Sequence, residues 1–238
     1  MGELKTTNNK IKVDLMRSKP ELSIYLRIFV LVSVLIICFG LYFNIFYSGV
    51  YIIGDSMLPT LHGASGPEHK DDDYDEAGDY IYVNKYEKPT YGDIVVVTRR
   101  DEKEVNGETV VEKTTIVKRV IAMGGDYVRI SDGVVSIKYK GKTDFVPLSE
   151  NYISEDRNTI KNKFPVIDGM YDENGYRVED NCLFLLGDNR DNSLDSRENG
   201  GRSFPVGDVF GVATSWSLNN KKFFKFMHYT FGFGYSFG

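Results

Sequence analysis

One uninterrupted apolar run constrains this chain more than any other feature of its sequence. Residues 28–47 read IFVLVSVLIICFGLYFNIFY and contain no charged side chain. About 20 helical residues are needed to cross the roughly 30 Å hydrocarbon layer of a membrane. A cleavable secretion leader has a shorter apolar core, of about 7 to 15 residues, and ends at a small-x-small site. The run therefore predicts one transmembrane helix over residues 28–47.

The segment before this helix is basic. Residues 1–27 carry six Lys and Arg side chains against three Asp and Glu. Positive residues beside a membrane helix favour the cytoplasmic side. We therefore expect a single-pass protein of the cell membrane, with residues 1–27 in the cytoplasm and residues 48–220 forming an extracytoplasmic domain. The whole chain has a net charge of −5, which gives no general attraction to phosphate backbones and argues against a nucleic-acid partner.

Beyond residue 48 the apolar pattern changes from helical to alternating. Short runs such as YIYVNKY at 80–86, DIVVVT at 93–98 and TTIVKRVIA at 114–122 have the period of β-strands. Gly-Asp pairs precede several such runs, as expected of turn residues between strands. The pattern predicts a mainly β domain after the membrane helix.

Four regions interrupt this pattern. Residues 62–78 and 99–113 are highly charged and are expected to form loops, the second being hairpin-like with its turn at Asn106-Gly107. Residues 127–180 have weaker strand signals and suggest an inserted subdomain. The basic and aromatic tail, residues 221–238, leaves two alternatives open: contact with anionic lipid headgroups or a frayed terminus.

The first candidate for chemistry is Ser56, nine residues beyond the end of the predicted helix. Nine extended residues span about 30 Å, so its hydroxyl must lie close to the membrane surface. Gly54 permits a tight turn before Ser56, and Pro59 restricts the chain after it, which together can expose a hydroxyl. Taken alone, a serine in a turn is more often a local hydrogen-bonding residue.

The second candidate is Lys118, within the alternating run 114–122. In a strand it shares a face with Ile116 and Val120, while Arg119 points to the opposite face. A lysine buried among apolar neighbours has a lowered pKa and can act as a base near neutral pH. A lysine that reaches out from a strand end to pair with an acid fits the periodicity equally well.

A third candidate is the loop at 187–197, GDNRDNSLDSR. Asx and Ser side chains bond backbone amides and Arg forks onto carboxylates, so this loop can support an adjacent site. From Asp191 its spacing imitates a calcium-binding EF-hand, but the invariant glycine position holds Ser196 and the final glutamate position holds Arg202. Because zinc-site spacings are also lacking, we expect no metal.

Taken together, these motifs resemble bacterial type I signal peptidase. The resemblance rests on the N-terminal helix, SMLPTL at 56–61, GDIVVV at 92–97, KRVIAMGGD at 118–126 and GDNRDNSLDSR at 187–197. It implies a signal-peptidase-like antiparallel β-sheet catalytic domain behind one transmembrane α-helix.

The resemblance also implies residue roles. Ser56 would be the nucleophile and Lys118 the general base. Ser193 would supply a hydroxyl that orients the lysine, and Asp195 with Arg197 would form a supporting ion pair. Where Gram-negative members place a serine two residues before the nucleophile, this chain has a glycine, so the backbone N–H of Ser56 would bind the oxyanion with water as a possible second donor.

The implied activity is that of a serine endopeptidase, a hydrolase that needs no cofactor and removes N-terminal signal peptides after Ala-x-Ala-like sites. Its partners would be preprotein signal peptides emerging from the export machinery, and the lipid bilayer. The substrate pockets are expected from residues that flank the Ser–Lys dyad: Ile52, Ile53, Gly54, Met57, Leu61, Ile116 and Val117. Two alternatives remain open, a dedicated peptidase for pilins or surface proteins and a non-catalytic membrane-tethered binding domain.

Overall fold

The chain divides into two units at the peptide bond between Phe46 and Tyr47. The structure, a computed structural model, describes residues 20–65, 77–105, 108–131, 133–153, 175–198 and 202–232.

The first unit contains helix α2 (Pro20–Phe46). By length and composition its stretch Ile24–Phe46 can cross a membrane. The apolar helix predicted from the sequence is confirmed, but its bounds differ from residues 28–47. The helix begins earlier because helical hydrogen bonding does not require an apolar sequence. It ends at Phe46 because the next residue, Tyr47, pairs with Asn84 in a strand.

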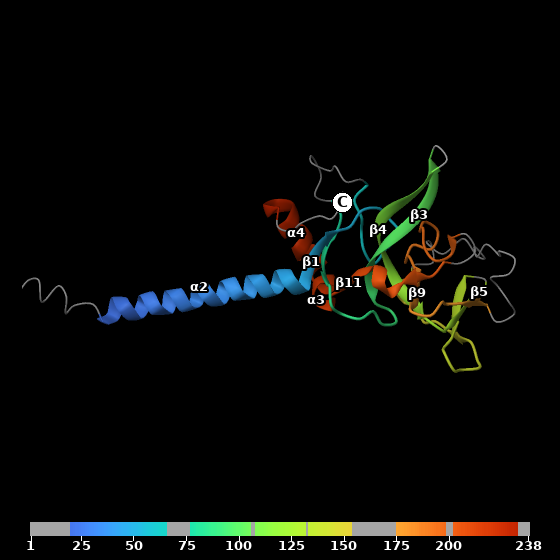
Figure 1. The fold of residues 1–238 in the computed structure, drawn as a ribbon, viewed down its shortest axis with the longest axis horizontal. Helices are drawn as coiled ribbons and strands as arrows, with labels where there is room; N and C mark the ends of the chain where they lie inside the picture. The colour runs from blue at the N-terminus through green and yellow to red at the C-terminus, as the bar shows by residue number, and fades with distance from the viewer. Residues whose placement is uncertain are drawn as a thin grey trace, which may run out of the picture. The chain divides into compact units, whose positions relative to one another are not determined.

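The second unit is built on a seven-stranded antiparallel sheet with the order β1-β2-β11-β3-β4-β9-β10 (Figure 1). A single turn of 3-10 helix, η3 (Val206–Asp208), leads into β11, the last strand along the chain. The expected mainly β architecture behind one apolar helix is thus confirmed. The strands are β1 (Tyr47–Tyr51), β2 (Tyr80–Asn84), β3 (Ile94–Val105), β4 (Glu108–Met123), β9 (Cys182–Leu186), β10 (Phe204–Pro205) and β11 (Val209–Ala213).

A second, four-stranded antiparallel sheet has the order β7-β6-β5-β8. It falls within residues 127–180, where the sequence suggests an inserted subdomain, and its own cluster of buried side chains includes Val128, Val135 and Ile137. That cluster also contains Phe184 from β9, so the two sheets share a core. The strands are β5 (Tyr127–Ser131), β6 (Val134–Lys138), β7 (Val146–Pro147) and β8 (Tyr176–Arg177).

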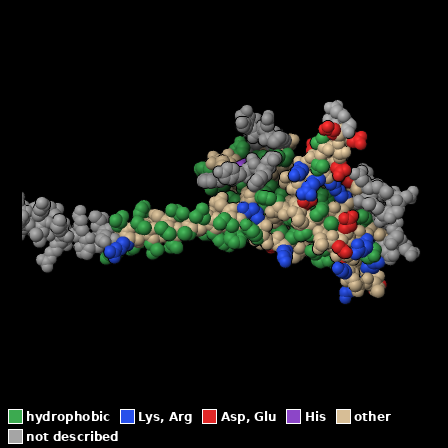
Figure 2. All heavy atoms as spheres, in the orientation of Figure 1, with side chains coloured by type: hydrophobic (Ala, Val, Ile, Leu, Met, Phe, Trp, Pro, Cys, Tyr) green, Lys and Arg blue, Asp and Glu red, His purple; other side chains and the backbone are tan. Residues whose placement is uncertain are grey.

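The hairpin expected within the charged stretch 99–113 is confirmed, but its two sides are strands rather than loop. Strands β3 and β4 stay paired from Ile94↔Arg119 to Val105↔Glu108, so the charged stretch is a long two-stranded arm. Backbone pairing satisfies the amides whatever the side chains are, and the outer part of the arm, residues 102–104 and 108–115, is exposed to water. Figure 2 shows acidic and basic side chains along the visible side of the arm. Its expected turn at Asn106-Gly107 lies outside the described residues, as does most of the expected acidic loop at 62–78.

The core of the large sheet lies on both of its faces. In β3 the run Ile94–Val97 alternates between two clusters of buried side chains, which explains why this strand is apolar at every position. One of these clusters also takes in Met57 and Leu61 from the segment that follows β1. Burying a side chain of this size stabilises a fold by about 1.5–3 kcal/mol, so the core holds this segment in place.

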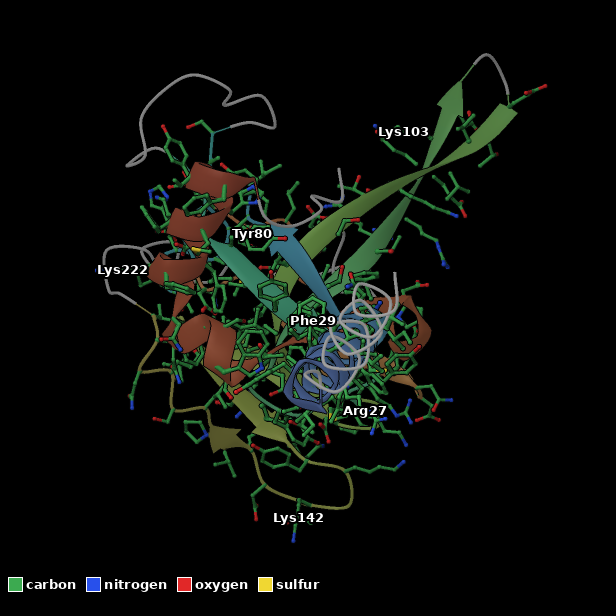
Figure 3. All side chains as sticks on the ribbon, turned by 90° about the vertical axis from the view of Figure 1, so that its left-hand side faces the viewer. Arg27, Phe29, Tyr80, Lys103, Lys142 and Lys222 are labelled. Carbon is green, nitrogen blue, oxygen red and sulfur yellow. The ribbon has the colours of Figure 1, made fainter. Side chains whose placement is uncertain are left out.

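The chain continues beyond the last strand as two short helices, α3 (Ser215–Asn219) and α4 (Lys221–Phe231). Helix α4 packs beside β2 (Figure 3). It ends at Gly232, whose φ of 64° is the left-handed conformation that glycine adopts at a helix end. A frayed terminus is therefore wrong for residues 221–231, while residues 233–238 lie outside the described part of the chain.

Candidate active site

The loop after β1 presents Ser56 at the surface of the large sheet. Gly54 has a φ of 76°, which allows the chain to turn sharply before the serine. After the serine, Met57 and Leu61 are 1% and 0% exposed, and the amide of Leu61 donates to the carbonyl of Met57 at 2.9 Å. Ser56, which is half-buried, therefore lies between the turn at Gly54 and a segment that is anchored in the core by Met57 and Leu61.

Lys118 meets this hydroxyl from β4. Its Nζ donates to Ser56 Oγ at 2.7 Å and to the carbonyl oxygen of Val117 at 2.8 Å. The lysine is 3% exposed. Of the two alternatives that the periodicity leaves open, the structure has the buried lysine rather than one that reaches out to solvent.

The environment of Lys118 changes its protonation. Burial lowers the pKa of its ammonium group to about 8, because the charged form loses solvation, and the nearby carboxylate of Asp195 opposes this effect only in part. A fraction of the lysine is then neutral near pH 7.5. A neutral amine in hydrogen-bond contact with a hydroxyl has the geometry to remove its proton.

The loop after β9 supplies the expected ion pair. Arg197 Nε lies 2.8 Å from Asp195 Oδ1 and its Nη2 lies 2.9 Å from Oδ2, while the amide of Gly187 donates to Oδ2 at 3.0 Å. Burial by itself raises the pKa of Asp195, but the hydrogen bonds and charge of Arg197 outweigh it and hold this pKa below its ordinary value. The carboxylate therefore stays ionised near the lysine.

Ser193 lies in the same loop. Its Oγ is buried, and its side chain is one of the groups that lower the pKa of Asp195. The two hydrogen bonds recorded for Lys118 Nζ go to other atoms. An orienting role for Ser193 on the lysine thus remains a prediction.

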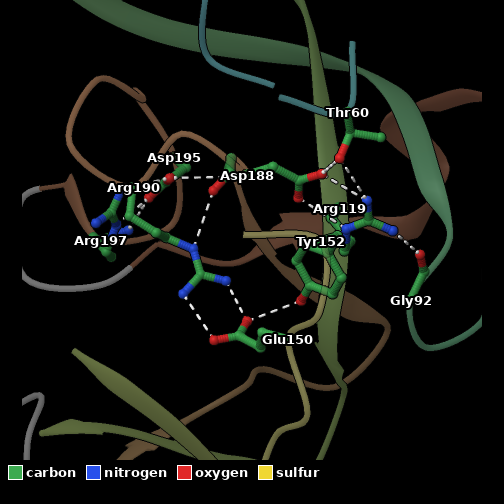
Figure 4. A network of polar contacts seen from close by, with 10 residues as sticks. Thr60, Gly92, Arg119, Glu150, Tyr152, Asp188, Arg190, Asp195 and Arg197 are labelled. Carbon is green, nitrogen blue, oxygen red and sulfur yellow. Dashed lines mark hydrogen bonds and ion pairs between the residues drawn. The ribbon is translucent and has the colours of Figure 1, made fainter. Parts of the chain in front are cut away.

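A network that the sequence analysis missed connects three segments of the site (Figure 4). Arg119 Nε and Nη2 donate to the two carboxylate oxygens of Asp188 at 2.8 and 2.6 Å, and its Nη1 donates to the carbonyl of Gly92 at 2.8 Å. Thr60 Oγ1 donates to the same carboxylate at 2.5 Å. The strand of the lysine, the loop of the serine and the loop after β9 are therefore joined.

A second arginine extends this network. Both terminal nitrogens of Arg190 bond the carboxylate of Glu150, and its Nε donates to the carbonyl of Gly187 at 3.1 Å. Tyr152 donates to Glu150 at 2.8 Å, and its ring lies 3.9 Å from the guanidinium carbon of Arg119. Alternation in β4, which turns Arg119 away from Lys118, is a sequence signal for the contacts of Arg119 alone.

The serine loop is also bound directly to the loop after β9. Asn189 donates from its backbone amide to the carbonyl of Ser56 at 3.1 Å and from Nδ2 to the carbonyl of Asp55 at 3.0 Å. Both bonds are made by the backbone on either side of the serine. They hold the backbone from which the Ser56 side chain projects.

The Ser56 and Lys118 side chains open into a cavity of about 710 Å³ that continues along the β3–β4 arm. Of the seven expected pocket residues, Gly54 and Ile116 line it. Ile52, Met57 and Leu61 are 0–2% exposed in the core and do not line this cavity, so their assignment to the substrate pockets stays a prediction. Ile53, although 46% exposed, and Val117 do not line it. The lining residues are Gly54, Asp55, Ser56, Arg99, Asp101, Glu102, Lys103, Thr114, Ile116, Lys118, Asn192 and Leu194.

The described residues include no group of three or more His, Cys, Asp and Glu side chains placed to bind a metal ion. A serine hydroxyl bonded to a buried lysine of lowered pKa is instead an arrangement suited to an activated hydroxyl nucleophile. The protein-family model described as signal peptidase, peptidase S26, matches residues 24–217. The chain therefore belongs to the signal peptidase family S26.

Individual relatives agree with this assignment. A probable signal peptidase I-1 of Synechocystis is 34% identical over 150 residues, which cover 61% of this chain and 59% of that protein. Signal peptidase I P of Bacillus subtilis subsp. natto is 31% identical over 167 residues, covering 68% of this chain and 72% of the relative. The match thus spans less than two thirds of the Synechocystis protein. The family and the apolar helix together support a membrane-anchored protein.

A solved structure was also found. The crystal structure of a signal peptidase I from Enterococcus faecalis has 26% sequence identity and a TM-score of 0.37, covering 54% of this chain and 98% of that one.

Proposed function

We propose that this protein is a membrane-anchored endopeptidase that removes signal peptides from exported preproteins with a Ser56–Lys118 dyad. The single observation that carries this proposal is the 2.7 Å hydrogen bond between Lys118 Nζ and Ser56 Oγ. Membership of the signal peptidase family supplies the substrate class. The basic N-terminal segment favours a cytoplasmic location for residues 1–27, which would put the dyad on the extracytoplasmic side.

The reaction follows from this geometry. Neutral Lys118 accepts the Ser56 proton as Oγ attacks the scissile carbonyl, and a tetrahedral oxyanion forms. The lysine then gives its proton to the leaving amine, which leaves an ester between Ser56 and the signal peptide. Lys118, now neutral again, takes a proton from water as the water attacks this ester, and it returns the proton to Ser56 Oγ as the ester breaks. The ionised Asp195–Arg197 pair and Ser193 are positioning residues for the lysine in this proposal.

The backbone amide of Ser56 is a candidate donor to the oxyanion. Among the described residues it donates to no acceptor, whereas the carbonyl of the same residue is held by Asn189. A preorganised amide that develops its hydrogen bond only as charge forms stabilises the transition state more than the ground state.

The open edge of β4 beside the dyad supports binding of an extended substrate. β9 pairs with β4 from Arg119 to Met123. Within the described residues, no strand pairs with the same edge between Thr114 and Lys118. The cavity runs along this stretch, past Thr114 and Ile116. A peptide that adds here as a further strand gains backbone hydrogen bonds, and its alternate side chains face the cavity. Small side chains before the cut are the preference implied by the family resemblance.

The test uses the full chain in detergent with a preprotein that carries an Ala-x-Ala site. Ser56→Ala and Lys118→Ala should each lower the cleavage rate at least 10³-fold, whereas the exposed controls Ser131→Ala and Lys113→Ala should leave it within about twofold. Mass spectrometry of the products should place the cut after the second alanine. Cleavage that survives both dyad variants would contradict the mechanism, and a cut elsewhere would contradict the specificity.

A further inference from the structure

Helix α4 presents a row of large aromatic side chains to the surroundings. Phe223, Phe226 and Phe231 are 56%, 48% and 59% exposed, and Tyr229 is 48% exposed. Exposed apolar side chains that gather on one element mark an interaction surface, whereas scattered ones need no explanation. Helix α4 lies beyond residue 217, where the match to the family ends.

The opposite side of α4 is firmly packed. The Phe224 ring lies 5.3 Å from that of Tyr82, and His228 stacks on Tyr80 at 4.3 Å between ring centroids. Lys221 pairs with Asp79 at 3.3 Å. The exposed aromatic side chains therefore belong to a helix held in a fixed orientation, and packing against the sheet already uses its other face (Figure 3).

Chain continuity relates this helix to the membrane. Tyr47 is joined by one peptide bond to Phe46, the last residue of the candidate span. Its ring lies 5.9 Å from that of Trp216 in α3, and Trp216 contacts Phe224 of α4 at 5.5 Å. Tyr47, the first residue after the candidate span, is thus connected to α4 through the Trp216 ring, which contacts both Tyr47 and Phe224.

The charge of the helix favours an anionic surface. Lys222 and Lys225 lie in the same short helix as the exposed phenylalanines, and the described part of α4 contains no Asp or Glu. A helix with basic residues beside an aromatic face binds at the boundary between lipid headgroups and acyl chains. Long lysine side chains can extend towards the phosphates while rings enter the apolar layer.

We propose that α4 is a second membrane contact, which binds the surface of a bilayer containing anionic phospholipids. Phe223, Phe226 and Phe231 enter the headgroup region, and Lys222 and Lys225 face the lipid phosphates. This contact would hold the β domain in one orientation on the membrane that α2 crosses. It involves none of the residues assigned to the dyad, so it stands whether or not the protein cleaves signal peptides.

The test exploits the single tryptophan of the chain. The full-length protein is reconstituted in vesicles of equal phosphatidylglycerol and phosphatidylcholine with brominated acyl chains, which quench nearby tryptophan fluorescence. Trp216→Phe/Phe226→Trp carries the reporter on α4. The control, Trp216→Phe/Val134→Trp, carries it at a half-exposed position of β6. We expect at least threefold stronger quenching for the α4 reporter. Equal quenching of the two reporters would overturn the proposal.

Two further comparisons sharpen the result. Adding Lys222→Glu/Lys225→Glu to the α4 reporter should at least halve its quenching in the anionic vesicles. Unchanged quenching would overturn the role of lipid charge. The fluorescence of the α4 reporter could instead depend on the number of protein molecules per vesicle and not on bromination of the lipid. That result would indicate a second copy of the chain on α4 and would also overturn the proposal.

A last comparison leaves Trp216 in place, in case its replacement disturbs packing. Phe223→Ser/Phe226→Ser changes only exposed side chains, so the fold should be retained. Quenching of Trp216 by brominated lipid should fall at least twofold in this variant. No change relative to the unmodified chain would overturn the proposal.

Discussion

Arg119 and Asp188 form a two-pronged ion pair, with nitrogen to oxygen distances of 2.8 and 2.6 Å. Their side chains are 11% and 1% exposed. Arg119 directly follows Lys118 in β4, and Asp188 begins the loop that carries Asp195. This pair therefore fixes the strand of the proposed base against the loop that carries Asp195, whose charge raises the pKa of Lys118.

Replacing one partner of this ion pair should lower the free energy of unfolding more than replacing both partners. Arg119→Met leaves the buried Asp188 carboxylate without its counter-ion, which costs about 3–5 kcal/mol of unfolding free energy. Arg119→Met/Asp188→Leu removes both charges and should recover at least half of that loss. Thermal unfolding of the two single variants and the double variant measures the coupling. Simple additivity of the two single effects would contradict this account.

Replacing the proposed base should stabilise the protein. The pKa of Lys118 is about 8 in the folded chain against an ordinary 10.5. Because the folded state binds this proton more weakly than the unfolded state, the protonated lysine lowers the free energy of unfolding. This loss of stability is complete below pH 8 and disappears as the pH rises through 10.5. The difference corresponds to at most about 3 kcal/mol. Lys118→Met should therefore unfold at a higher temperature than the unmodified chain at pH 7, but at a similar temperature at pH 10.5. A lower unfolding temperature at pH 7 would argue against a desolvated lysine.

Activity should rise with pH through the pKa of Lys118. The neutral amine is the active form, so kcat/KM should be half-maximal at about pH 8. The positive charge of Arg99 helps to lower this pKa. Arg99→Gln should shift the midpoint to higher pH. Arg100→Gln is the control, since Arg100 is half-exposed and pairs with Asp208. Equal midpoints in both variants would exclude this contribution of Arg99.

Gly187 has no space for a side chain. A Cβ atom there would lie 2.1 Å from Ser193 Oγ and 2.5 Å from the backbone oxygen of Ser56. Since the backbone beside the serine would have to move, Gly187→Ala should lower kcat by about 10²-fold. A Cβ at Gly207 would meet nothing within 4 Å, so Gly207→Ala should keep normal activity. The two variants are compared by cleavage kinetics after circular dichroism has verified folding. Equal rates would mean that the serine loop tolerates the shift.

Local patterns in the sequence were sufficient for some features and misleading for others. Alternation predicts that Lys118 shares a face with Ile116, but it does not say whether that face is covered. Charge density suggests a hairpin-like loop at residues 99–113, whereas continuous backbone pairing makes both sides of this hairpin strands. Closeness in sequence to Ser56 suggests pocket walls at Met57 and Leu61, but it does not say that these side chains also pack in the core.

The sequence by itself determined the apolar helix, the mainly β class and the chemical types of the groups near the site, because each depends on local composition and periodicity. Only the tertiary structure decided that Lys118 is buried against Ser56, 62 residues away, and that Arg119 meets Asp188, 69 residues away. Such contacts depend on strand register and on which loops cover a sheet face. Register and coverage are set by packing of the whole domain and leave no mark in the spacing of nearby residues.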